Sequence, residues 1–98
     1  MPFIQTIEFT TGQIDEFNTV LDEWLVKTEG KRAASRGTLT RDRDRANTYL
    51  QIVEFPSYEE AMANSDLPAT SEFAARLTEL CDAPATFRNL DVIRDDHL

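Results

Sequence analysis

Hydrophobic and polar residues alternate in four separate segments of the chain. An alternation with a period of two is typical of a β-strand, because successive side chains point to opposite faces of a sheet. The segments are residues 3–10, 33–41, 46–55 and 86–94. The second of them has Leu39 as its only large apolar side chain, so we expect it at an edge of the sheet. The polar stretch that joins it to the third segment predicts a β-hairpin.

Between these segments the hydrophobic residues recur at intervals of three or four, which is typical of an amphipathic helix. Residues 13–29 show this pattern, with Thr11 as the expected N-cap and Gly30 just beyond the end. Ser57 followed by Glu60 forms a capping box, which predicts a short helix to about residue 64. Pro68 then fits the first turn of another helix, capped by Asp66 and reaching about residue 80.

The order of elements is β-α-β-β-α-β, which is the split βαβ, or ferredoxin-like, arrangement of an α+β fold. We expect residues 1–98 to form a single domain with a polar tail at about 95–98. Two right-handed crossovers would place the helices on one face of a four-stranded antiparallel sheet of order 4-1-3-2. Three of the strands carry apolar residues on both faces, so we expect a homodimer in which the uncovered sheet faces pack together.

The charge of the chain narrows the range of partners. Its 98 residues include 18 acidic and 10 basic side chains, giving a formal net charge of −8. Nucleic acids and anionic membranes attract basic proteins, so we expect neither as the main partner. One cysteine, Cys81, cannot form an intrachain disulfide, and the N-terminal residues lack the pattern of a secretory signal. A cytoplasmic location is the resulting expectation.

The basic side chains are concentrated in residues 31–45. This segment holds six of the ten basic residues and only two of the 18 acidic ones. One interpretation is a rim that attracts anions beside a pocket. The simpler interpretation, which we favour, is a charged edge hairpin that prevents sheets from aggregating.

The passage from the third strand into the next helix resembles a known superfamily. Residues 53–62 read strand, then Ser57-Tyr58-Glu59-Glu60-Ala61 at the helix start. This pattern is similar to that of the dimeric α+β barrel superfamily, in particular the antibiotic-biosynthesis monooxygenase-like proteins. The resemblance implies a dimeric barrel and an activity on a small aromatic or polyketide-like substrate.

The same resemblance covers the broken-helix stretch, where many members carry a histidine. This chain has other polar residues there, namely Asn64, Ser65, Thr70 and Ser71. The chemistry of the histidine-bearing relatives, including haem degradation, is therefore not carried over.

No catalytic residue can be assigned from the sequence. The single Cys and the single His, His97, lie in no metal-ligand spacing, and we expect neither a metal nor a cofactor. His97 lies next to the C-terminus, so Cys81 is expected to be a small core residue rather than a nucleophile.

Polar or amphipathic residues within apolar patterns are the candidates for lining a pocket. Trp24 is either a core residue or the edge of a cavity where its indole N–H finds a partner. Gln51 stands among apolar side chains and must be hydrogen-bonded if it is buried. Of the neighbours Arg88 and Asn89, one should face the interior. The candidate pocket-lining residues are Trp24, Tyr49, Gln51, Asn64 and Arg88.

Two classes of function fit these observations. The first, which the resemblance implies, is a cofactor-independent monooxygenase, in which the substrate anion itself activates oxygen inside a dry cavity. The alternative is a non-catalytic homodimer that binds a small apolar ligand or a protein partner. In a third possibility the barrel is structural and the helix surface carries the function.

Overall fold

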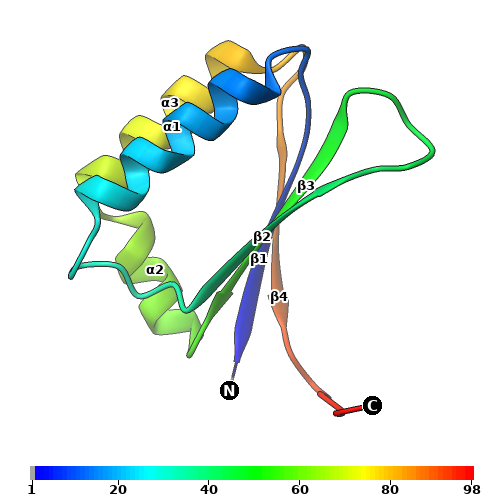
Figure 1. Ribbon diagram of the computed structural model, residues 1–98. Coiled ribbons are helices and arrows are strands. Elements are labelled where there is room, and N and C mark those ends of the chain that lie inside the picture. Colours follow the sequence, from blue (N-terminus) through cyan, green and yellow to red (C-terminus); the bar gives the residue numbers. More distant parts are fainter. Residues whose placement is uncertain (1) are drawn as a thin grey trace.

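The computed structural model describes residues 2–98 and shows three helices on one side of a four-stranded sheet (Figure 1). The elements are β1 (Phe3–Thr10), α1 (Ile14–Lys27), β2 (Arg36–Arg41), β3 (Thr48–Phe55), α2 (Tyr58–Ser65), α3 (Pro68–Leu80) and β4 (Thr86–Asp91). The strand order is β2-β3-β1-β4, and every neighbouring pair is antiparallel. The predicted α+β, ferredoxin-like architecture is therefore confirmed, with the last helical region divided into α2 and α3.

The structure confirms some of the capping residues predicted for α2 and α3 and contradicts one of them. The Ser57 hydroxyl oxygen accepts a hydrogen bond from the Glu60 N–H at 3.2 Å, so Ser57 is confirmed as the N-cap of α2. Pro68 occupies the first turn of α3, as predicted. The expectation that Asp66 caps α3 is wrong, because Asp66 closes α2 and the residue at the start of α3 is Leu67.

Thr11 does not cap α1 directly, contrary to the prediction. Gln13 precedes the helix and makes no side-chain capping bond. The buried Thr11 hydroxyl instead accepts from the Gln13 N–H at 3.0 Å and donates to the Leu80 carbonyl at 2.6 Å. Thr11 therefore joins the beginning of α1 to the end of α3.

The last strand ends earlier than the pattern predicts. We expected residues 86–94, whereas β4 ends at Asp91. Asp91 pairs with Phe3, the first residue of β1. Beyond this pair the Val92 N–H still donates to the Pro2 carbonyl at 3.2 Å, but β1 itself has no further residue with which the chain could pair.

Two apolar clusters fill the space between the helices and the sheet, one at each end. The first is built on Phe9, Phe17, Tyr49, Leu77 and Ile7, and the second on Phe3, Phe55 and Ala61. The strand register explains their positions, because Phe9 pairs with Tyr49 at one end of the sheet and Phe3 with Phe55 at the other. The residues between these pairs are free to line a cavity.

The face of the sheet opposite the helices is uncovered (Figure 1). Alternation along the paired strands places four apolar side chains on it, namely Ile4, Leu50, Ile52 and Leu90. Ion pairs flank them, with Arg36 3.8 Å from Glu54 and Arg88 4.0 Å from Glu8. Within residues 2–98, no helix combines the length and the apolar character needed to cross a bilayer.

Candidate ligand-binding cavity

A cavity of about 510 Å³ lies between the helices and the sheet. Its floor comes from the middle of β1 and β3, where Ile7 pairs with Gln51 and Gln5 with Val53. α1 and α3 supply apolar walls, and the segment before β2 supplies the remaining side. This volume falls within the range of about 300–1,000 Å³ that is typical of small-molecule sites.

Gln51 is a buried polar residue on the floor of the cavity. Its side chain is buried, with 5% of the residue exposed, yet its Oε1 atom has no hydrogen-bond partner among residues 2–98. Gly37 leaves room for this amide, because a Cβ atom there would lie 3.3 Å from the Gln51 Nε2 atom. An unsatisfied buried acceptor costs about 1–3 kcal/mol. Gln51 Oε1 is therefore prepared to accept a hydrogen bond from a ligand or a water molecule.

Asn64, near the end of α2, borders the same cavity and is also buried. Its Oδ1 atom accepts a hydrogen bond from the Ala33 N–H at 3.3 Å, which ties α2 to the segment before β2. This bond uses the acceptor end of the amide, so the NH₂ end is the part that remains for a ligand.

Trp24 on α1 and Phe73 on α3 form an aromatic wall. The Trp24 indole N–H donates to the Thr70 hydroxyl oxygen at 3.0 Å, which supplies the partner that the sequence reasoning required. The Trp24 and Phe73 ring centroids lie 6.3 Å apart. Trp24 therefore belongs both to the helix–helix contact and to the cavity.

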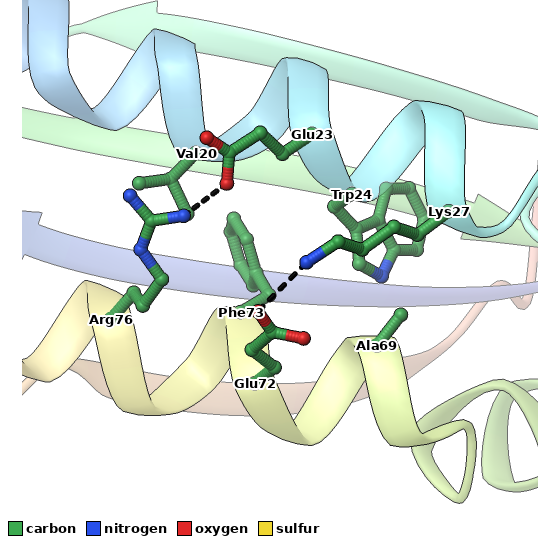
Figure 2. A pocket seen from close by; sticks show the side chains of 8 residues that line it. All are labelled: Val20, Glu23, Trp24, Lys27, Ala69, Glu72, Phe73 and Arg76. Carbon is green, nitrogen blue, oxygen red and sulfur yellow. Dashed lines mark hydrogen bonds and ion pairs between the residues drawn. The ribbon is translucent and has the colours of Figure 1, made fainter.

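The outer side of this wall is a shallow groove between α1 and α3 (Figure 2). Lys27 Nζ lies 2.7 Å from Glu72 Oε1, and Arg76 forms a second ion pair with Glu23. Both pairs cross from one helix to the other above Phe73 and Val20, as Figure 2 shows. They hold the two helices together on the solvent side of the aromatic wall.

The charged groups around the cavity are basic. Arg32 and Arg36 border it, and its lining contains no Asp, Glu, His, Cys or Tyr within the described part of the chain. Arg32 Nη1 donates to the Leu25 carbonyl at 3.0 Å and to the Thr28 hydroxyl oxygen at 3.3 Å. Arg36, in contrast, directs its Nε atom toward Glu54 at 3.8 Å.

Three of the five candidate residues, Trp24, Gln51 and Asn64, lie around the cavity. Tyr49 faces the same side of the sheet but is buried in the first apolar cluster, with its ring 5.7 Å from that of Phe9. Arg88 lies on the opposite face of the sheet, near Glu8, and does not border the cavity.

Sequence reasoning did not single out Gln5, Phe73 or Arg32 as cavity residues. Gln5 shares a face with Phe3 and Ile7 in the alternating pattern, so that pattern could have identified it. Arg32 belongs to the basic segment 31–45, but the sequence does not show which of its cations turns inward.

Cys81 lies outside the cavity and packs against the first apolar cluster, half-buried. Burial raises the pKa of its thiol, and the neighbouring Asp82 carboxylate raises it further. A raised pKa lowers the thiolate fraction at a given pH, and the thiolate is the reactive form. We therefore expect iodoacetamide to alkylate Cys81 several-fold more slowly at pH 8 than it alkylates the urea-unfolded chain, with mass spectrometry following the single adduct. Equal rates for the folded and unfolded chains would contradict this expectation.

The sequence matches no protein-family model and no curated protein. Solved structures, however, share the fold across nearly the whole chain. SnoaB from Streptomyces nogalater, a cofactor-independent oxygenase, is 20% identical and superposes with TM-scores of 0.81 and 0.79 in two crystal structures. The match covers 96% of this chain and 95% of SnoaB.

Two further structures give the same result. Rv0793 from Mycobacterium tuberculosis is 14% identical, with a TM-score of 0.79 over 99% of this chain and 100% of its own. An antibiotic biosynthesis monooxygenase is 15% identical, with a TM-score of 0.74 over 96% of this chain and 100% of its own. The resemblance predicted from residues 53–62 is thus confirmed in the fold, and this chain has the architecture of the antibiotic-biosynthesis monooxygenase-like proteins.

Proposed function

We propose that this protein is a cofactor-independent monooxygenase that acts on a small aromatic substrate of the anthrone or quinol type. The observation that carries the proposal is the cavity, in which an unpartnered amide oxygen, Gln51 Oε1, lies beneath an aromatic wall. An aromatic ring that bears a hydroxyl group matches both features, because the ring packs on Trp24 and Phe73 while the hydroxyl donates to Gln51.

The reaction needs little from the protein beyond binding and orientation. An anthrone loses a proton from its CH₂ carbon, and the resulting carbanion transfers an electron to O₂. The radical pair then forms a C–O bond, and the peroxide anion takes up a proton in place of the one lost. Loss of water from this hydroperoxide leaves the quinone carbonyl. One O₂ is consumed for each anthrone, one oxygen atom enters the product and the other leaves as water.

The chain's own groups would act on the substrate anion. The Asn64 NH₂ group would donate to the anionic ring oxygen, since Asn64 borders the cavity and its Oδ1 atom is already engaged by the Ala33 N–H. Preorganised donors inside a cavity that excludes water stabilise such an anion more than water does. The fold shared with SnoaB, a cofactor-independent oxygenase, supports this proposal.

One observation favours the alternative, a non-catalytic ligand-binding protein. No carboxylate, imidazole, thiol or phenol borders the cavity within residues 2–98, so the lining offers no titratable general base. In the monooxygenase the substrate's proton must then pass to water or hydroxide, so the rate should rise with pH. In the alternative, aromatic ligands bind and no oxygen is consumed.

Oxygen uptake with anthrones and quinols tests the two functions. We expect uptake above the spontaneous rate for the native protein, and a kcat/KM about 10- to 100-fold lower for Gln51→Leu, which cannot bind the substrate hydroxyl. Gln13→Leu is the matched control, because Gln13 is exposed at the start of α1, and it should behave as the native protein does. No uptake above background for the native protein, at neutral and alkaline pH across the panel, would leave the non-catalytic alternative.

A further inference from the structure

We infer that Arg32 binds a carboxylate group on the substrate, so that the preferred ligand is an aromatic acid. The inference rests on the proposed function, because the same cavity would hold the aromatic body. It adds a second recognition point at the border of the same cavity and assigns it to a residue outside the sheet and helices.

The hydrogen bonds of Arg32 leave one edge of its guanidinium group unused. Both bonds come from Nη1, one to the Leu25 carbonyl at 3.0 Å and one to the Thr28 hydroxyl oxygen at 3.3 Å. The planar group also lies over the Trp24 ring, 5.6 Å from its centroid. These contacts fix the guanidinium plane, and the edge formed by Nε and Nη2 is left to receive a ligand. Two parallel N–H groups on one edge match the two oxygens of a carboxylate.

The charge around Arg32 is not balanced by the protein. Within residues 2–98 no carboxylate oxygen lies within 4.0 Å of its guanidinium nitrogens, whereas Arg36 and Arg45 both have acidic partners. Arg32 is also half-buried at the border of a cavity whose lining holds no acidic residue. A partly desolvated cation without a counter-ion is a strong site for an anion.

The net negative charge of the chain means that general electrostatic attraction would not explain the binding of an acid. A protein with a formal charge of −8 repels anionic ligands in general, so binding of an acid would have to come from a specific group. The remaining arginines of residues 31–45 do not offer one, because Arg45 pairs with Asp42 and Glu8, and Arg41 lies over the Tyr49 ring at 5.8 Å. Arg43 is exposed in the turn between β2 and β3.

Two ligands that differ only in the presence of a carboxylate group test the inference. Rhein and chrysophanol share a dihydroxyanthraquinone ring system, and rhein has a carboxylate where chrysophanol has a methyl group. Trp24 is the only tryptophan and borders the cavity, so quenching of its fluorescence, corrected for ligand absorbance, reports binding without turnover. We expect rhein to bind about tenfold more tightly than chrysophanol at low salt, and expect this advantage to shrink as salt is added.

Variants of Arg32 identify the group responsible. Arg32→Gln should remove the advantage of rhein over chrysophanol, and Arg32→Lys should restore part of it. Arg43→Gln is the control, since it removes the same charge from the exposed turn, and it should keep the full advantage.

The two possible failures can be told apart. Equal binding of rhein and chrysophanol by the native protein, or a rhein advantage that survives Arg32→Gln, overturns the role of Arg32 even if anthrones are oxidised. A rhein advantage that depends on Arg32, with no oxygen uptake from any anthrone, supports the carboxylate site and overturns the monooxygenase. Because the native comparison uses no variant, the inference stays testable even if Arg32→Gln does not fold.

Discussion

Replacing Phe17 by alanine is expected to lower the free energy of unfolding by about 3–5 kcal/mol. Phe17 is 1% exposed and stacks on Phe9 with ring centroids 4.7 Å apart, while Phe73 meets its edge at 5.9 Å. Phe17 on α1 therefore contacts both β1 and α3. Since a domain of this size is stable by only about 5–15 kcal/mol, the variant should unfold at a much lower urea concentration.

A second variant on the same helix provides the control for Phe17. Val26 lies on α1 with 73% of its surface exposed, so Val26→Ala should change the free energy of unfolding by no more than about 0.5 kcal/mol. Urea titration followed by circular dichroism measures both variants. A loss below about 1 kcal/mol for Phe17→Ala would mean that the cluster around Phe9 closes over the missing ring, contrary to the close packing of protein interiors.

The fold follows closely from the sequence because local patterns carry it. Alternation in residues 3–10 and 46–55 identifies the two central strands, and the 3–4 spacing of residues 13–29 identifies α1. The failure at Asp66 occurs because two signals compete at one position. Asp66 has a side chain suited to an N-cap, but its backbone N–H donates to the carbonyls of Met62 and Ala63, so the residue closes α2 instead.

The site follows from the sequence only in part. Alternation places Tyr49 and Gln51 on the same face of β3, but it does not say which one meets the cavity. The tertiary structure decides this, since Tyr49 is buried in the cluster of Phe9 and Phe17, whereas Gln51 lines the cavity. The position of Arg32 is harder to predict from the sequence, because it depends on the irregular segment between α1 and β2, for which no periodic pattern exists.

We propose that two copies of the chain associate through the uncovered face of the sheet. The helices cover the other face (Figure 1). The uncovered face carries the apolar side chains of Ile4, Leu50, Ile52 and Leu90. Leu90 is 43% exposed although it belongs to a strand. A two-fold axis would bring identical apolar centres together and leave the flanking ion pairs at the rim.

Sedimentation equilibrium of the native chain at micromolar concentration should give a mass of twice 11.2 kDa. Leu90→Asp should raise the dimer dissociation constant at least about 100-fold, because the two-fold axis repeats the substitution and buries two unpaired charges. Val26→Asp places the same charge on the exposed surface of α1 and should leave the dimer intact. Ile52→Asp repeats the test on a central strand, with circular dichroism to establish that each variant is folded. A native chain that sediments as a monomer at this concentration would contradict the proposed dimer. The cavity bordered by Arg32 and Gln51 would then be the functional unit by itself, because it lies within one chain.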